Sequence, residues 1–372
     1  MKKAETGRSE AATPDSPAAP LEEAFVLLDN SSGRGPPSQL FTSPREIVVA
    51  QTPEEVPAAF ARLESGRAEG LYAAGFFSFE LGYVLEPKLA GLMPGDRKVP
   101  LLWFGLYNAP TALNEAEVDR WLSTHTKSGS YQFSNVSRAW TKEEYVQRFE
   151  KVQEKIRSGD IYQLNLTFKA RFRLSGSPLT FYRDLRQRQR VAYGGIVDTG
   201  QVTVLTASPE LFIEMKGRTI ETRPMKGTSP RGGTPDADAE ARRVLSSDVK
   251  QRAENLMIVD LMRNDIGRIS EIGSVQVTDL FTVETYRTLH QMTSGVRATL
   301  QEGVTLLELM RAIFPPGSVI GAPKIRAQEL IAEYETEPRG VYCGAIGSIS
   351  PDGQALFNVA IRSPIIFRDG SG

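Results

Sequence analysis

The sequence predicts an α+β fold in which antiparallel sheets are flanked by helices. Three observations lead to this class. Strand-like runs are joined by turns into hairpins instead of alternating regularly with helices, helical stretches begin at capping motifs, and no repeat of solenoid or propeller period occurs. The 372 residues, 40% of them hydrophobic, suffice for one large or two ordinary domains.

The first third of the chain is rich in predicted strands. Residues 1–20 contain Ala, Pro, Ser and acidic residues without the apolar core of a secretory signal, so we expect a disordered tail. Apolar runs predict strands, and one stretch predicts a helix: strands at 24–29, 45–50, 70–85 and 100–110, and a helix at 54–66. Residues 111–140 are more polar, and we place there the boundary between an N-terminal lobe (21–125) and a catalytic domain (130–372).

A hairpin is predicted at residues 203–228. Two strand-like runs, TVLTASPELFIEM and RTIETRPMKGT, meet at a turn formed by Gly217 and Arg218. In that register Glu210 lies opposite residue 225 or 226, so Glu210 and Lys226 meet at one end of the hairpin. Such a pair can be an acid and a nucleophile or a plain salt bridge, and spacing alone favours the salt bridge.

Other elements follow from capping motifs and periodicity. A capping box of Thr141 and Glu144 opens a helix that ends at Gly159 and leads into a strand at 160–172, and Thr305 with Glu308 opens another helix. Residues 246–269 predict one long helix, and a further helix begins at Pro323. Residues 341–350 and 355–367 predict a hairpin about a Pro-Asp-Gly turn.

The composition excludes several functional classes. Lys and Arg number 44 against 45 Asp and Glu, a net charge of -1, so there is no basic excess for nucleic acid. One Cys and two His exclude a metal site built from these residues and fit a reducing compartment. No run of about 18 apolar residues predicts a membrane span. We therefore expect a cytoplasmic protein without membrane or nucleic-acid partners.

A few polar residues stand in positions that suit a binding site. Arg362, in an apolar predicted strand, should meet an anion, either a substrate carboxylate or an internal acidic partner. Glu254 fits a Mg²⁺ ligand or a solvated helix face. Ser318 precedes a helix N-terminus that suits an anion, although turn chemistry explains it equally, and His290 is more typical of a satisfied core histidine than of a catalyst.

Taken in order, seven motifs resemble those of the chorismate-utilising enzymes over roughly residues 130–365: DIYQLNLT, SPELF, TRPMKGTSPRG, AENLMIVDLMRNDIGRI, TVETYRTLHQMTS, FPPGSVIGAPK, and RGVYCGAIGSI with NVAIRS. The resemblance implies two intertwined lobes around a chorismate cleft, and Mg²⁺ as cofactor. Within the family, anthranilate synthases carry alanine where this chain has Lys226, whereas aminodeoxychorismate synthases carry a nucleophilic lysine. The sequence is similar to the latter, which serve p-aminobenzoate and folate biosynthesis.

The resemblance also implies roles for individual residues. Lys226 would be the nucleophile and Glu210 the general acid, with a depressed lysine pKa from burial or nearby cations. Glu254 would bind Mg²⁺. Substrate-binding positions carried over from the family are Gln163, Gly227, Thr228, His290, Ser318, Tyr342, Gly344, Ala345 and Arg362. Gln163 stands where isochorismate-forming relatives keep a water-activating lysine, which argues against water as the nucleophile. Some relatives hold tryptophan near the LLD motif, so Leu27, Leu28, Asp29 and Ser31 are a possible tryptophan pocket, although a structural strand explains them equally.

One departure concerns the C-terminus. The family continues past NVAIR through a Gly-rich strand and an acidic helix that supplies a second Mg²⁺ glutamate, whereas this sequence stops at FRDGSG. We therefore expect weak or absent synthase activity for these residues alone. A glutamine amidotransferase subunit is the implied source of ammonia. An anthranilate synthase-like enzyme and a non-catalytic chorismate- or subunit-binding remnant are the alternatives.

Overall fold

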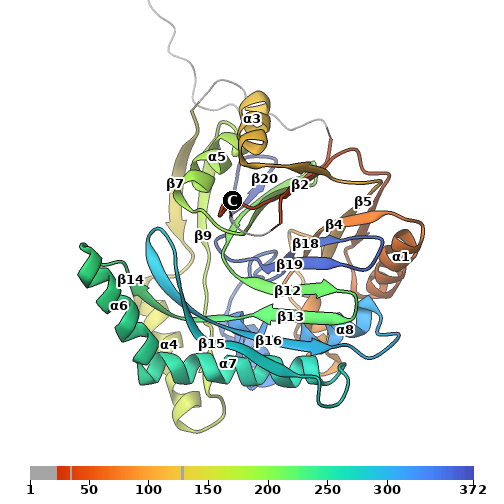
Figure 1. Cartoon of the computed structure of the whole chain (residues 1–372). Helices are drawn as coiled ribbons and strands as arrows, with labels where there is room; N and C mark the ends of the chain where they lie inside the picture. Colours follow the sequence, from red (N-terminus) through yellow and green to blue (C-terminus); the bar gives the residue numbers. More distant parts are fainter. Residues whose placement is uncertain (1–22, 34–35, 127–129) are drawn as a thin grey trace, which may run out of the picture.

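The computed structural model describes residues 23–33, 36–126 and 130–372, so the predicted tail at 1–20 lies outside the described residues. Two antiparallel sheets are packed face to face and covered on their outer sides by helices (Figure 1). The smaller sheet has the order β20-β11-β10-β1-β2-β6. Its strands are β20 (Ile365–Phe367), β11 (Val202–Ser208), β10 (Tyr193–Asp198), β1 (Phe25–Asp29), β2 (Ser38–Phe41) and β6 (Thr111–Leu113).

The larger sheet carries the predicted hairpins. Its order is β14-β16-β13-β12-β19-β18-β4-β5-β3, with β15 on the other side of β16. Its strands are β14 (Met225–Pro230), β16 (Leu289–Thr299), β13 (Thr219–Arg223), β12 (Leu211–Lys216), β19 (Ala355–Val359), β18 (Ala345–Ile349), β4 (Tyr72–Phe77), β5 (Leu102–Tyr107), β3 (Glu46–Ala50) and β15 (Gln276–Thr285). Two further pairs are β7 (Gln132–Arg138) with β9 (Ala170–Ser175), and β8 (Gln163–Leu164) with β17 (Gly321–Ala322).

Alternating side chains of the large sheet build separate apolar layers. On β4, Phe77 faces the core shared with α1, α7, α8 and α9, while Phe76 faces the small sheet together with Trp103 of β5. A third core lies between the small sheet and α3 and α5. The helices are α1 (Val56–Ala68), α2 (Leu81–Leu85), α3 (Glu115–His125), α4 (Lys142–Arg157), α5 (Pro178–Arg188), α6 (Pro235–Ser247), α7 (Val249–Gly267), α8 (Leu306–Ile313) and α9 (Lys324–Tyr334), with 3-10 turns η1 (Pro53–Glu55), η2 (Pro87–Leu92) and η3 (Gly317–Val319).

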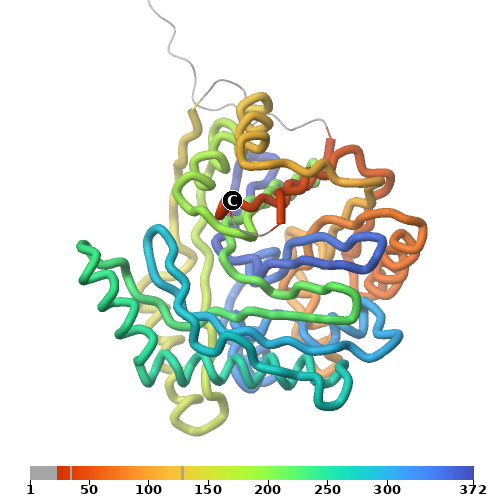
Figure 2. The backbone as a smooth tube through the Cα atoms, in the orientation of Figure 1, coloured from red at the N-terminus to blue at the C-terminus, as the bar shows by residue number. Residues whose placement is uncertain are grey.

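The two halves of the chain are interleaved. In Figure 2 the red and orange N-terminal strands lie beside green and blue strands from the C-terminal half. Strand β1 pairs with β10, and β4 pairs with β18, so each sheet draws on both sides of the predicted boundary at 125–130. The boundary therefore does not separate two sheets, and the predicted intertwined α+β architecture is confirmed.

Several predicted elements need correction. The run 70–85 is strand only as far as Phe77 and then turns into α2. The polar segment 111–140 contains the amphipathic helix α3, and the predicted strand 160–172 is reduced to β8 and the start of β9. The helix predicted at 246–269 is two helices, because Asp248 caps the second by accepting a bond from Gln251 N at 2.7 Å.

Both capping boxes are confirmed. Thr141 and Glu144 bond reciprocally at the start of α4, and Thr305 and Glu308 do the same at α8. The described residues include no helix with the length and apolar character of a membrane span.

Candidate active site

Glu210 and Lys226 lie at the same end of the large sheet, as the hairpin register predicts. Glu210 directly precedes β12, and its backbone oxygen accepts a bond from Val359 N at 3.0 Å. Its side-chain Oε1 accepts a bond from Met225 N at 3.4 Å, which brings the carboxyl to the residue before Lys226. Strand β13 breaks at Pro224, and β14 resumes along β16 with Lys226 as its second residue.

Burial shifts both groups toward their neutral forms. Glu210 is 3% exposed, and burial raises its pKa to about 7 against the opposing effects of a Ser318 hydrogen bond and the Lys226 charge. Burial also lowers the pKa of Lys226, although Glu210, Glu254 and Cys343 act in the opposite sense. Burial thus moves the pKa of the acid up and the pKa of the amine down, the directions that an acid and a nucleophile require.

Ser318 joins this centre from a different part of the chain. It lies in η3, between α8 and β17, and is buried. A hydrogen bond from Ser318 opposes the rise of the Glu210 pKa, so the loop between Pro315 and Pro323 brings a polar group to the acid. The structure thus places Ser318 next to the acid.

The prediction that Arg362 lies in a strand with its guanidinium among apolar groups is wrong. Strand β19 ends at Val359, and the chain then crosses to the small sheet as β20. Arg362 lies in this crossing with φ +53°, is exposed, and donates from Nη1 to Gln189 Oε1 at 3.2 Å. Its charge still reaches Glu210, whose carboxylate form it favours.

A cavity of about 1040 Å³ adjoins Arg362. Its lining includes Tyr342, Arg362, Lys169 and Trp140. Burial raises the pKa of Tyr342, so the phenol stays protonated as a hydrogen-bond donor. The volume is ample for a small organic acid.

Gly344 and Ala345 lead from Tyr342 into β18. Gly344 N donates to Val341 O, and Gly344 O accepts a bond from Ala360 N, both at 2.9 Å. A Cβ on Gly344 would lie 2.1 Å from Phe77 O, so only glycine permits this approach to β4. Ala345 is a buried ladder residue of β18 opposite Val359. The N–H of Gly344 is thus already bonded within the protein.

His290 is satisfied within the protein. It is 1% exposed; its Nε2 lies 2.9 Å from Asp238 Oδ1 and its Nδ1 lies 3.0 Å from Thr285 Oγ1. Asp238 in turn is bound by Arg231, whose hydrogen bonds hold the Asp238 pKa low. His290 therefore links β16 to α6 through Asp238, as a core histidine with satisfied hydrogen bonds would.

Gln163 on β8 presents an unsatisfied group. Its Oε1 is buried and has no hydrogen-bond partner in the described part of the chain, while its backbone pairs with Ala322 next to η3. A buried acceptor without a partner is costly unless a ligand or water supplies a donor. Thr228, by contrast, is exposed and donates to Gln291 Oε1 at 3.1 Å.

Glu254 lies on α7 with its side chain 35% exposed, 3.9 Å from Lys250. The described residues contain no group of three or more His, Cys, Asp or Glu that could hold a metal. A single carboxylate fits only the kind of Mg²⁺ site in which substrate and water complete the coordination. Glu254 faces the centre closely enough to act on the Lys226 pKa.

The LLD motif lies in β1, remote in sequence from these residues. The Asp29 carboxylate accepts hydrogen bonds from Arg186, Tyr182 and Ser38. The Ser31 hydroxyl donates to Val191 O and accepts from Val191 N. Leu28 and Asp29 contribute to the lining of a cavity of about 550 Å³ between the sheets. The side-chain oxygens of Asp29 thus already have protein partners, as a structural strand requires.

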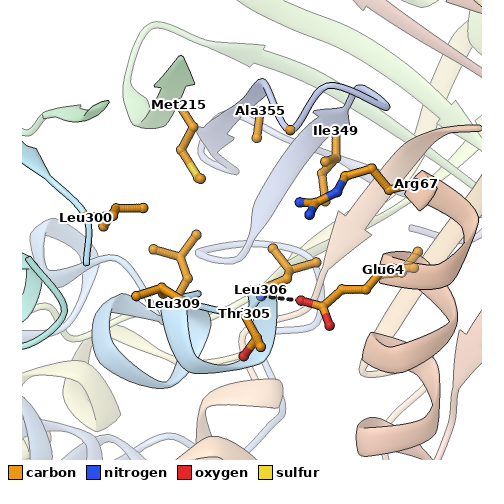
Figure 3. Close-up of a pocket in the computed structure, with 12 residues that line it drawn as sticks. Glu64, Arg67, Met215, Leu300, Thr305, Leu306, Leu309, Ile349 and Ala355 are labelled. Carbon is orange, nitrogen blue, oxygen red and sulfur yellow. Dashed lines mark hydrogen bonds between the residues drawn. The ribbon is translucent and has the colours of Figure 1, made fainter. Parts of the chain in front are cut away.

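Another cavity lies between α1 and α8 (Figure 3). Leu306 N donates to Glu64 at 2.7 Å beside it, and Met215, Leu309 and Ile349 provide apolar walls. Its volume of about 30 Å³ holds roughly one water molecule, so it is too small for a substrate.

Sequence reasoning missed two amides next to the lysine. Asn255 follows Glu254 on α7, and Gln291 follows His290 on β16, and both donate to the backbone at Lys226–Gly227. In the sequence, each amide stands out only as a polar residue among apolar neighbours. The partner of each lies at least 29 residues away along the chain, so the sequence did not indicate the bond.

This fold and site define an enzyme class that acts on chorismate. Residues 24–371 match the family described as chorismate binding enzyme, and the chain belongs to that family. Among solved structures, the chain is similar to anthranilate synthase component I from Streptococcus pneumoniae TIGR4, with a TM-score of 0.71 and 25% identity, covering 100% of this chain and 88% of that one.

Curated relatives refine the class. Aminodeoxychorismate synthase component 1 of Klebsiella aerogenes is 36% identical over 308 residues, which cover 78% of this chain and 68% of that protein. Anthranilate synthase component 1 of Methanothermobacter thermautotrophicus is 33% identical over 338 residues, covering 86% and 72%. The chain is therefore similar to both amino-transferring branches of the family.

Proposed function

We propose that this protein is an aminodeoxychorismate synthase component I, which converts chorismate and ammonia to 4-amino-4-deoxychorismate. The observation that carries the proposal is the pairing of the buried Glu210 with the half-buried Lys226 at one end of the large sheet. Burial raises the pKa of the acid to about 7 and lowers that of the amine. Shifts in these directions favour a protonated acid beside a free amine.

In the proposed reaction, Lys226 Nζ forms a bond to C2 of the chorismate ring. The two conjugated ring double bonds, C1=C2 and C5=C6, shift to C1=C6 and C4=C5, the C4–O bond breaks, and Glu210 gives its proton to the departing hydroxyl, which leaves as water. Ammonia then forms a bond to C4, both double bonds return to C1=C2 and C5=C6, and the C2–N bond to Lys226 breaks, with the proton lost by the new amino group balancing the one that the departing lysine amine takes up. Splitting one displacement into two steps is the role of a covalent nucleophile, and a general acid of this kind contributes about 10²–10⁴-fold.

Substrate binding would use the cavity lined by Tyr342 and Arg362, whose charge acts on Glu210. Arg362 is exposed toward solvent and Tyr342 keeps its phenolic proton, so together they offer a cation and a donor to a substrate carboxylate. The unpartnered Oε1 of Gln163 is an acceptor suited to an N–H donor, in keeping with ammonia as the nucleophile.

Glu254 would supply the protein's carboxylate to a Mg²⁺ ion completed by the substrate and water. When bound, the ion would neutralise a substrate carboxylate. Ammonia would come from a glutamine amidotransferase subunit, because the relatives' designation as component 1 points to a second component. A chain with a single, buried cysteine suits the cytoplasm.

Anthranilate synthase is the second candidate, favoured by the 33% identity to the Methanothermobacter enzyme. The two reactions share chorismate and ammonia and differ in the product. Lys226 weighs toward aminodeoxychorismate, because a lysine that bonds the ring is needed only where the C4 hydroxyl is replaced with retention at that carbon.

The test is to incubate the purified protein with chorismate, Mg²⁺ and an ammonium salt, then identify product and peptide adducts by mass spectrometry. We expect 4-amino-4-deoxychorismate, loss of turnover in Lys226→Ala, and an adduct on Lys226 in the unaltered chain. Lys216→Ala is the matched control, since that lysine is 67% exposed on the same sheet. Anthranilate as product, or full turnover in Lys226→Ala, would refute the proposal.

A further inference from the structure

Strand β14 carries a bulge at Lys226–Gly227. Met225 pairs with Thr293 and Thr228 pairs with Gln291, so two residues of β14 face the single Met292 of β16. A bulge of this kind redirects a side chain and leaves ladder groups without their usual partners. The carbonyls of both bulge residues must therefore find other donors.

Gly227 gives the bulge its shape. Its φ is +98°, a conformation that strains any other residue. A Cβ at this position would lie 3.1 Å from Gln251 Oε1 and 3.2 Å from the Cβ of Met292, so the space beside it is also closed. The kink that follows Lys226 is thus built into the packing of α7 against β16.

Asn255 holds the first carbonyl of the bulge. Its Nδ2 donates to Lys226 O at 3.3 Å, and its Oδ1 accepts from Ser294 Oγ at 2.6 Å. Ser294 itself accepts a bond from Phe281 N at 3.0 Å, so its one hydroxyl proton is directed at Asn255. This chain of bonds fixes which end of the amide faces Lys226, and both Asn255 and Ser294 are buried.

Gln291 holds the second carbonyl. Its Nε2 donates to Gly227 O at 2.9 Å, and its Oε1 accepts from Thr228 Oγ1 at 3.1 Å. The two amides approach from different elements, α7 and β16, and bond consecutive peptides. Together they restrain the backbone on the C-terminal side of the Lys226 Cα.

We propose that Asn255 and Gln291 are positioning residues that hold the Lys226–Gly227 bulge and so set where the Lys226 amine lies relative to Glu210. Neither residue touches the reacting atoms. The inference rests on the proposed function for its catalytic consequence, while the restraint itself is a property of the backbone. Small displacements of a reacting group are costly, since about 1 Å can reduce a rate on the order of 10²-fold.

The experiment uses Asn255→Leu and Gln291→Met, which keep the side-chain shape and remove the donors. Gln301→Met is the matched control, because Gln301 makes the same kind of bond, to Ser270 O at 3.1 Å, beyond the far end of β16. Amide hydrogen exchange is followed by mass spectrometry in peptides covering 224–230, with 211–216 as an internal reference. Steady-state kcat and the KM for chorismate are measured on the same preparations, together with Mg²⁺ binding by calorimetry.

We expect exchange at 224–230 to quicken about tenfold in both variants while 211–216 is unchanged, and kcat to fall about tenfold or more with KM within about twofold. Unchanged Mg²⁺ binding would separate the effect of Asn255 from its neighbour Glu254. Exchange at 224–230 equal to that of the unaltered chain overturns the restraint. Faster exchange with undiminished kcat overturns the positioning role. Full turnover in Lys226→Ala would instead refute the proposed nucleophile, and the exchange measurement would still decide whether the amides hold the bulge.

Discussion

Asp29 carries the negative charge of a buried ion pair beneath the small sheet, and replacing it should be costly. Its Oδ2 accepts from Arg186 Nε at 2.6 Å and from Tyr182 OH at 2.8 Å. The side chains of Arg186 and Asp29 are only 3% and 0% exposed. Asp29→Asn keeps the shape but leaves a buried guanidinium without its main counter-charge. Breaking a buried pair on one side costs about 3–5 kcal/mol, and we expect the lower end because Asp119 remains.

The same arginine provides the control. Arg186 Nη1 also donates to Asp119 Oδ1 at 2.7 Å, but the Asp119 side chain is 48% exposed. Solvent screening should limit the cost of Asp119→Asn to about 0.2–1 kcal/mol. Urea unfolding of both variants gives the two values from the shift in midpoint at constant slope. Equal losses, or a loss below about 1 kcal/mol in Asp29→Asn, would refute the claim that burial sets the strength of this pair.

Three further predictions concern the active centre. A general acid must be protonated, and the pKa of Glu210 is raised to about 7, so kcat/KM should fall about tenfold per pH unit above 7. Glu210→Gln should abolish this alkaline decrease. A decrease that persists in the variant would assign it to another group. Gly227→Ala, at φ +98°, should lower the free energy of unfolding by about 1–3 kcal/mol in thermal or urea unfolding. Gly200→Ala is the control and should cost less, because φ there is +79° but the space around the added Cβ is open. Glu254→Gln should weaken Mg²⁺ binding measured by calorimetry at least about tenfold, and unaltered binding would remove Glu254 from the metal site.

Local sequence determined a good part of the fold and of the active centre. The capping boxes at Thr141 and Thr305 and the hairpin turn at Gly217 were predictable because each depends on residues within a few positions of one another. The hairpin register brought Glu210 to the Lys226 end of the sheet, since side-chain alternation counts outward from the turn. The order of motifs pointed to the family, which a match over residues 24–371 then established.

Other features depended on contacts between distant parts of the chain. The crossing between β19 and β20 places Arg362 outside any strand, although its apolar neighbours predicted a buried one. Burial raises the pKa of Glu210, and Ser318, which opposes that rise, lies 108 residues further along the chain. Asn255 and Gln291 reach the Lys226 bulge only once α7 packs on β14 and β16. Periodicity and turn chemistry indicate which face of an element is apolar. The burial of a side chain and its hydrogen-bond partners depend instead on what the folded protein packs against that face, so only the tertiary structure determines them.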